Sequence, residues 1–373
     1  MESYGQLKLE LIHKGLVVPD EVRDVSEVIG GYCDGRPGDE IVLSLAENFI
    51  VKVPIKETGQ SQPTLNLVNG KVKLRSMDKE IEVNIVPLPN FVREQMKKRS
   101  PISENACIDG YCMNLFLRAV GQKNRLNLSQ ETILSVIKAA FEEGAADLIQ
   151  LNMDYCREPD RGLTRLAPVV KAIKKEFSTF IALRGFPPKD KQFLDRVYAA
   201  GIDLLNFPLE GFVGFPKKED VISQPLVYGA LEYAAKIFPP GTVWTELFLE
   251  PGSIDPLKDK IAYLTKKGIL PLLRLTTPSI ATEEYFHNVI EVARYLETNV
   301  QNSRLPLKWL FPHCRYMSPL DTGFFLDPTD KAKLNAKPVY KSLLGRKTLE
   351  GYTKLRRKLR IKDVSDSYES AGL

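Results

Sequence analysis

Cysteine is scarce in this chain, and the features that mark secreted or membrane-spanning proteins are missing. The 373 residues include 5 cysteines, which is too few for a disulfide scaffold and an odd number. Such residues are free thiols, metal ligands or core residues of a reducing compartment. No window approaches the ~18 uncharged apolar residues that a bilayer-spanning helix needs. The first residues lack the basic segment and apolar core of a secretory signal. We therefore expect a cytoplasmic protein without a membrane partner.

Strong net charge is also missing. The formal net charge is +5 and the pI is about 8.7, short of the concentrated basic character of nucleic-acid-binding domains. We do not expect a nucleic-acid partner. The apolar content of 43% and the charged content of 27% are ordinary for a soluble globular protein. The length suggests one large domain and an accessory one.

Residues 1–95 read as a small antiparallel β-rich module. Short runs with alternating or β-branched residues occur at 7–12, 40–55, 64–74 and 80–86. Asn69-Gly70 stands between two of them, and this dipeptide favours a hairpin because both turn positions need positive φ. We expect the module to end near Pro87-Leu88-Pro89.

Residues 96–335 show an alternation of helices and strands. The pattern predicts helices at 130–143, 162–176, 190–200, 224–237, 256–267 and 282–297, with strands at 148–153, 180–185, 204–209, 243–249, 270–275 and 307–311. Repeated units of this kind require a parallel sheet. Because no GxGxxG fingerprint is present, a complete or partial (β/α) barrel is favoured over an open doubly wound sheet. Its active face is the carboxyl ends of the strands.

The remaining residues, 336–373, are basic and then acidic. Tyr352, Leu355 and Leu359 recur at roughly helical spacing, which predicts a basic amphipathic C-terminal helix followed by a tail. A helix docked on the barrel, and a contact with an acidic partner or with nucleic acid, are both open interpretations.

Chemically versatile side chains stand where the predicted barrel strands end. They are Asp154, Tyr155, Cys156, Arg184, Asn206, Glu210, Glu246, Arg274, His313 and Cys314. Each alone is weak evidence, since a carboxylate at a strand end is about as often a salt-bridge partner as a catalyst. Together they predict a site at the mouth of the barrel.

Cys107 and Cys112 lie five positions apart in a polar stretch that contains glycine, and we interpret that stretch as a loop. A helix, an apolar strand and then Met153-Asp154-Tyr155-Cys156 follow. This run, with "AAGIDLLNFPLEGF", "GTVWTELFLEPGS" and "LTKKGILPLLRLT" further on, resembles the radical S-adenosylmethionine (radical SAM) barrels of the biotin-synthase-related type. The similarity covers roughly residues 105–315. The spacing is C-x4-C in place of that family's C-x3-C-x2-C, and 153–156 replace its Gly-Gly-Glu-like turn.

The resemblance implies a 4Fe–4S cluster and S-adenosylmethionine as cofactors, and a TIM-barrel-like metal-binding enzyme. Cys107, Cys112, Cys156 and Cys314 are then the candidate cluster ligands, with Cys156 the favoured third thiolate. Glu210, Glu246, Arg184 and Arg274 become the candidate catalytic residues. The candidate cofactor-binding residues are Asp154, Tyr155, Asn206 and Glu210.

Three functions stay open at this point. The first is a radical enzyme with an unusual cluster, acting on a small or carrier-bound substrate and drawing electrons from a protein partner. The second is a barrel of the same type without a cluster, which binds a ligand or serves as the partner of a catalytic subunit. The third is a metal-dependent or metal-free lyase or hydrolase that uses His313, Asp154 and Glu246.

Overall fold

A computed structural model gives the fold. It describes residues 3–25, 40–56, 62–76, 79–86, 89–98, 105–120, 125–210, 222–275, 283–329 and 331–341, with single positions at 347, 351 and 355. Cys33 and nearly all of the predicted C-terminal helix lie outside these residues. None of the helices that the structure describes is long and apolar enough to cross a membrane.

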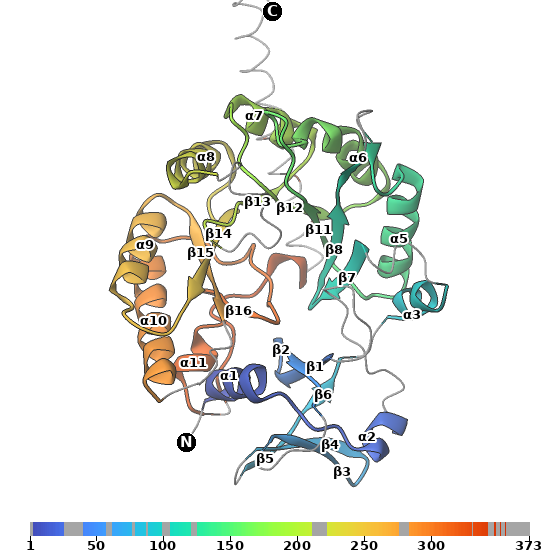
Figure 1. Ribbon diagram of the computed structural model, residues 1–373, viewed down its shortest axis with the longest axis vertical. Helices are drawn as coiled ribbons and strands as arrows, with labels where there is room; N and C mark the ends of the chain where they lie inside the picture. The colour runs from blue at the N-terminus through green and yellow to red at the C-terminus, as the bar shows by residue number, and fades with distance from the viewer. Residues whose placement is uncertain are drawn as a thin grey trace, which may run out of the picture.

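An 8-stranded sheet forms the centre of the molecule and curls into a half-barrel, with the strand order β16-β15-β14-β13-β12-β11-β8-β7 (Figure 1). The strands from β8 to β15 run parallel, whereas β7 and β16 run antiparallel to their neighbours at the two edges. Their bounds are β7 Ala106–Asp109, β8 Cys112–Leu117, β11 Leu148–Met153, β12 Phe180–Arg184, β13 Leu204–Asn206, β14 Val243–Leu249, β15 Leu270–Leu275 and β16 Tyr316–Met317. The predicted partial (β/α) barrel is confirmed.

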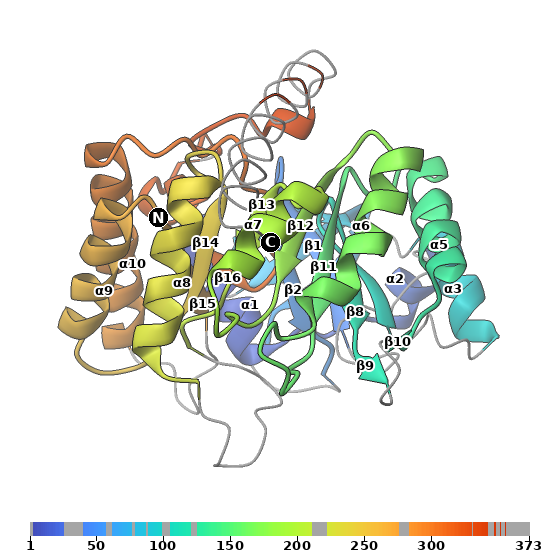
Figure 2. The same cartoon turned by 90° about the horizontal axis from the view of Figure 1, so that it is seen from above.

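Helices cover the outer face of this sheet, as the two perpendicular views show (Figures 1 and 2). The helix α5 illustrates why, because its buried residues Ile133, Val136, Ile137 and Ala140 recur at helical spacing. Ser129 starts the helix by accepting a hydrogen bond from the backbone N–H of Thr132. The covering helices are α5 Gln130–Glu142, α6 Leu163–Glu176, α7 Gln192–Ala200, α8 Gln224–Ile237, α9 Asp255–Lys266 and α10 Glu283–Asn302.

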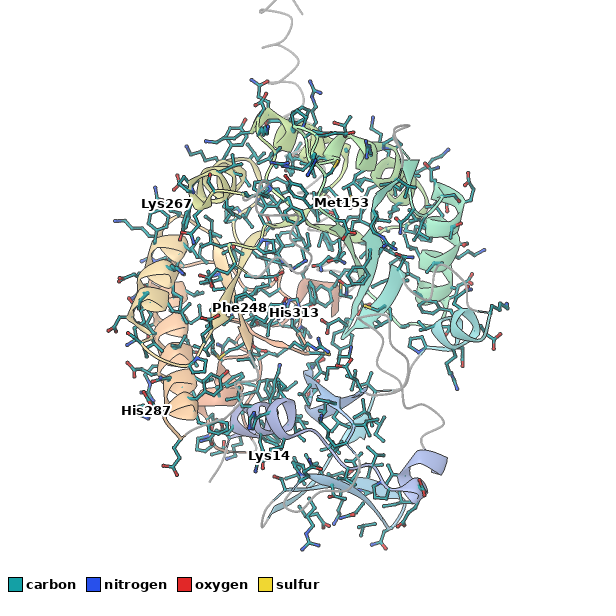
Figure 3. The ribbon with its side chains drawn as sticks, viewed as in Figure 1. Lys14, Met153, Phe248, Lys267, His287 and His313 are labelled. Atoms are coloured by element: carbon teal, nitrogen blue, oxygen red, sulfur yellow. The ribbon has the colours of Figure 1, made fainter. Side chains whose placement is uncertain are left out.

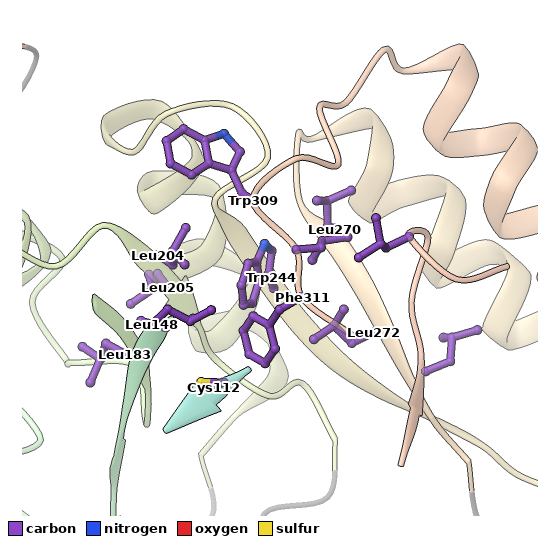
Figure 4. Packing of buried hydrophobic residues seen from close by; sticks show 14 of the residues in the cluster. Cys112, Leu148, Leu183, Leu204, Leu205, Trp244, Leu270, Leu272, Trp309 and Phe311 are labelled. Atoms are coloured by element: carbon purple, nitrogen blue, oxygen red, sulfur yellow. The ribbon is translucent and has the colours of Figure 1, made fainter. Parts of the chain in front are cut away.

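Aromatic side chains fill the concave face at the amino ends of the strands. Trp309 contacts Phe180 edge to face at 5.4 Å between ring centroids, and Phe311 contacts Trp244 at 5.7 Å. Figure 4 shows Trp309, Trp244 and Phe311 among the surrounding leucines. The predicted strand at 307–311 is therefore wrong. Its apolar residues insert into the half-barrel as side chains, and β16 takes the place beside β15.

The N-terminal residues form two small antiparallel sheets, β2-β1-β6 and β3-β4-β5. Asn69 and Gly70 have φ values of 53° and 74°, so the predicted hairpin between β3 and β4 is confirmed. The bounds are β1 Glu40–Ala46, β2 Phe49–Pro54, β3 Thr64–Val68, β4 Lys71–Ser76, β5 Lys79–Glu82 and β6 Asn84–Ile85. We call these sheets, together with α1 described next, the N-terminal module.

The predicted strand at 7–12 is wrong, because these residues belong to the helix α1, Tyr4–Lys14. The sequence does contain a helix signal here. Ser3 and Gln6 form a capping box, in which each side chain accepts a hydrogen bond from the other residue's backbone N–H. Gly5, Lys8, Leu9 and Ile12 are buried at helical spacing. The alternation of leucines at 7, 9 and 11 hid this pattern.

The N-terminal module lies in the gap between β7 and β16 (Figure 1). Phe49 stacks on Phe324 at 4.3 Å between ring centroids, and Tyr111, in the turn before β8, donates a hydrogen bond to Asn48. Arg315 forms an ion pair with Glu40 of β1. The module therefore closes the open side of the half-barrel.

The shorter elements are α2 Asp20–Val25, α3 Asn90–Lys97, β9 Ala119–Val120, β10 Arg125–Leu126, α11 Gly323–Leu326 and a 3-10 turn at Val339–Lys341.

Candidate functional site

A charged network occupies the concave face toward the carboxyl ends of the strands. Arg184, the last residue of β12, donates from Nε and Nη2 to the two carboxylate oxygens of Glu246 on β14, at 2.6 and 2.8 Å. Asn206, the last residue of β13, donates from Nδ2 to Glu246 Oε1 at 2.7 Å. The structure thus brings together three of the predicted site residues. They meet because parallel strands end at the same rim.

Tyr316 completes this network from the edge strand β16. Its hydroxyl donates to Glu246 Oε2 at 2.9 Å. Burial alone would raise the pKa of Glu246, but the charge of Arg184 and the hydrogen bonds from Arg184, Tyr316 and Asn206 lower it. Burial, followed by the charge of Glu246, raises the pKa of Tyr316. Near neutral pH the network therefore holds a carboxylate, a guanidinium and a protonated phenol.

Arg274 lies on β15 beside these groups, but in the described part of the chain no hydrogen bond joins it to Glu246. Its register partners are Phe248 on β14 and Tyr316 on β16. The guanidinium lies 5.7 Å from the centroid of the Phe248 ring, and Figure 3 labels Phe248 inside the ring of strands. Among the residues that the structure describes, no carboxylate pairs with Arg274. The described part of the network therefore carries two guanidinium groups and one carboxylate.

Three carboxamides lie on the strands next to this network, where Asn152 on β11 is the register partner of Arg184 on β12. Asn114 Oδ1 on β8 accepts from Gln150 Nε2 at 2.9 Å and from Asn152 Nδ2 at 3.1 Å, both on β11. Gln150 also donates to Asn152 Oδ1 at 2.9 Å. All three side chains are buried. Sequence reasoning missed them, although polar residues at alternate positions of a buried strand mark a polar face.

Glu210, predicted as both a catalytic and a cofactor-binding residue, lies next to Glu246, because its backbone N–H donates to the Glu246 backbone carbonyl at 3.2 Å, but its side chain does not join the charged network. Its Oε2 accepts a hydrogen bond from the backbone N–H of Phe248 at 2.8 Å, and its Oε1 pairs with Lys260 on α9. Both carboxylate oxygens therefore tie the segment after β13 to β14 and α9.

The other predicted cofactor-binding residues lie in the segment after β11. The Asp154 side chain is 59% exposed, with its nearest described cation, Arg118, at 3.9 Å. The hydroxyl of Tyr155 and the carbonyl of Cys156 both accept hydrogen bonds from Arg161 Nη1, at 2.8 and 3.0 Å. The structure does not bring these residues to Glu246.

The predicted cysteine loop is wrong. Cys107 lies on β7 and Cys112 begins β8, and the two strands form an antiparallel hairpin. Both cysteines are buried, and Figure 4 shows Cys112 near Phe311 and Leu148 on the aromatic floor. Cys112 is paired with Leu148 at the start of β11, whereas Cys156 follows the end of that strand. Strand residues rise about 3.3 Å each, so these two thiols lie at opposite ends of the half-barrel.

This placement does not fit the cluster that the resemblance implies, because three thiolates must converge on one cluster. Among the described residues, no group of three or more His, Cys, Asp or Glu side chains is arranged to hold a metal ion. Cys314, the other candidate ligand, is buried beside the hairpin, where its backbone N–H donates to Asp109 Oδ1 at 3.1 Å.

A second buried group lies near the turn of the β7–β8 hairpin. His313 Nδ1 is 3.9 Å from Asp109 Oδ2, and the imidazole lies 4.1 Å from Phe311 and 5.4 Å from Tyr316 between ring centroids. Burial opposes ionisation of Asp109, but hydrogen bonds and charge from His313 and hydrogen bonds from Cys314 lower its pKa to about 2. His313 Nε2 is buried without a hydrogen-bond partner among the described residues. His313 and Asp109 therefore form a largely buried pair in the interior of the protein.

Comparison with known proteins gives no family. No protein-family model matches the sequence, and no curated protein matches it. Solved structures match about half of the chain. Yersinia pestis DHPS is 18% identical over 52% of this chain and 68% of its own, with a TM-score of 0.31. A mutant tryptophan synthase alpha-subunit from Pyrococcus furiosus is 14% identical over 51% and 75%, with a TM-score of 0.30. Dihydropteroate synthase from Coxiella burnetii is 17% identical over 51% and 68%, with a TM-score of 0.29. Likenesses this low carry no argument about function, and the fold class follows from the strand order itself.

Proposed function

We propose that this protein binds a small anionic molecule on the concave face of its half-barrel, at the carboxyl ends of the strands. Arg274 carries the proposal. A guanidinium among largely buried side chains is expected to have a carboxylate partner, and none of the described residues supplies one. An anionic ligand would supply it, and a guanidinium binds carboxylates and phosphates in a bidentate way.

The neighbouring groups support the same proposal. Arg184 and Glu246 neutralise each other through two hydrogen bonds, so their charges leave that of Arg274 uncompensated. Tyr316 and the carboxamides of Asn114 and Gln150 add neutral hydrogen-bonding groups on both sides. Such a mixture of apolar walls and a few polar groups is typical of small-molecule sites.

The protein's own fluorescence tests the proposal, because its 2 tryptophans both lie on the aromatic floor. Titrations with phosphate, oxalate and S-adenosylmethionine, whose methionine end carries a carboxylate, are compared for wild type, Arg274→Met and Arg294→Met. Arg294 is an exposed residue of α10 and serves as the matched control. We expect at least one anion to bind, and Arg274→Met to weaken it by about 10- to 100-fold, the value of a charge-assisted hydrogen bond. Equal affinity in all three proteins, or no binding to wild type, would overturn the proposal.

Radical chemistry on a 4Fe–4S cluster remains a prediction, and the described geometry does not favour it because Cys112 and Cys156 lie at opposite strand ends. Anaerobic reconstitution with iron and sulfide tests it on wild type and on Cys107→Ala/Cys112→Ala. About four irons per chain and a broad visible band, both lost in the variant, would replace our proposal with the radical enzyme. The same result in both proteins would exclude these cysteines as ligands.

A further inference from the structure

Tyr316 is part of the proposed site, yet the strand that carries it is only two residues long. β16 comprises Tyr316–Met317 and pairs with β15 through Leu273 and Arg274. A two-residue strand has little stability of its own. The position of the Tyr316 hydroxyl must therefore depend on what holds the preceding bend, residues 313–316.

Lys8 of the N-terminal module holds this bend. Its ammonium donates to the backbone carbonyl of His313 at 2.8 Å and to that of Tyr316 at 3.0 Å. The side chain is fully buried, 4.8 Å from the centroid of the Phe49 ring and 4.0 Å from Asp321 Oδ2. A buried ammonium is kept only where its donors are satisfied, so the bend and α1 constrain each other.

Other contacts on the bend do not replace Lys8. Asp109 accepts from the backbone N–H of Cys314 at 3.1 Å, and Arg315 pairs with Glu40. These contacts fix the middle of the bend. Only Lys8, among the described residues, bridges the carbonyls at both of its ends.

We propose that Lys8 is a positioning residue, through which the N-terminal module fixes Tyr316 against Glu246 and so sets the affinity of the ligand site. This inference rests on the proposed function. The module acts on the site from outside it, because Lys8 contacts the backbone of the bend, and the bend contacts Glu246 through the side chain of Tyr316, at 2.9 Å.

A double-mutant cycle tests the inference with the anion that binds best to wild type. Lys8→Met removes the ammonium, and Tyr316→Phe removes the hydroxyl through which it acts. We expect Lys8→Met to weaken the anion by about tenfold, equivalent to one net hydrogen bond. In the Tyr316→Phe background we expect the same change to have almost no effect. Lys14→Met, on the same helix with an ion pair to Glu10, is the matched control and should bind like wild type.

Lys8→Met leaves Asp321 buried without its cation, which can unfold the protein. The variant Lys8→Met/Asp321→Asn removes both charges and is measured alongside. A second readout needs no ligand: in protein labelled with 3-fluorotyrosine, the fluorine NMR signal of Tyr316, assigned from Tyr316→Phe, should shift in the Lys8 variants and stay in Lys14→Met.

The outcomes separate the two proposals. If wild type binds an anion through Arg274 but the Lys8 variants bind it equally well and leave the Tyr316 signal in place, Lys8 has no positioning role and the site survives. A positioning role is also excluded if Lys8→Met weakens the anion equally in both Tyr316 backgrounds. If no anion binds to wild type, the proposed function and this inference fail together.

Discussion

The pairing of Arg184 with Glu246 is the residue-scale feature on which the site depends. Removing one member of a buried ion pair leaves the other charge uncompensated, which costs about 3–5 kcal/mol. We therefore expect Arg184→Met to lower the free energy of unfolding by that amount, measured by urea denaturation at pH 7. The double variant Arg184→Met/Glu246→Met removes both charges and should recover a large part of the loss. A double variant no more stable than the single one would contradict the pairing.

Ionisation of Asp109 makes the stability of the fold depend on pH in the acidic range. Its pKa falls from 3.8 to about 2 in the folded protein. A group with a lowered folded pKa stabilises the fold above its unfolded pKa, and this contribution is lost as the pH falls through the folded value. Between pH 4 and pH 2 we expect wild type to lose stability more steeply than Asp109→Asn, as followed by urea denaturation at each pH. Asp259→Asn, at an exposed position of α9, should follow the wild-type slope.

At the scale of elements, the β7–β8 hairpin packs closely against the N-terminal module. Gly110 has a φ of 60°, and a Cβ there would meet Ile50 Cδ1 at 2.7 Å and the Pro312 carbonyl oxygen at 3.0 Å. The left-handed backbone costs a non-glycine residue about 1–2 kcal/mol, and overpacking adds about 1–3 kcal/mol.

Gly144 separates these two effects, because its φ is 65° but nothing lies within 4 Å of its Cβ position. We expect Gly144→Ala to show only the backbone loss in urea denaturation, and Gly110→Ala to lose more. Equal losses would mean that the hairpin and the module are not in close contact.

The sequence predicted the elements of the half-barrel well, and for a physical reason. Parallel strands are buried on both faces and read as apolar runs between amphipathic helices. Thus β14 and β15 have the predicted bounds, Val243–Leu249 and Leu270–Leu275. Elements whose burial comes from distant contacts were misread. The segment at 307–311 is apolar because it fills the floor, and the stretch from Cys107 to Cys112 looks like a loop because its hairpin has a polar turn.

At the scale of the whole molecule, the N-terminal module and the half-barrel share their core. Phe49 is 1% exposed and stacks on Phe324 from the far end of the described chain. Truncating a buried aromatic costs about 3–5 kcal/mol. We expect Phe49→Ala to lower the unfolding midpoints of both parts together, with near-UV and far-UV circular dichroism giving coincident transitions. Two separate transitions, with only one of them shifted, would show that the parts fold independently.

The sequence also predicted that several of the polar side chains at the strand ends would lie close to one another. Arg184, Asn206 and Glu246 meet, and Arg274 lies beside them, because every parallel strand ends at the same rim, a property of the fold class that a strand pattern reveals. The four candidate cysteines do not converge on one point. Their predicted convergence depended on a loop at 107–112, and these residues form the β7–β8 hairpin instead. Tyr316 could not be predicted, since its place depends on the bend that Lys8 holds across 308 residues of sequence.

That long-range closure has a consequence for the order of events during synthesis. Lys8 meets the carbonyl of His313 across 305 residues, and domains fold as units as the chain leaves the ribosome. α1 is synthesised before every strand of the half-barrel. At about 5–20 residues per second, roughly 15 seconds or more pass before the ribosome has synthesised the bend at residues 313–316, which Lys8 contacts. Throughout that interval the helix has no place to bury Lys8. The contact that Lys8 makes between the N-terminal module and the half-barrel therefore forms late. A nascent chain stalled before His313 would carry every parallel strand of the half-barrel but would lack Tyr316 and the bend that positions it.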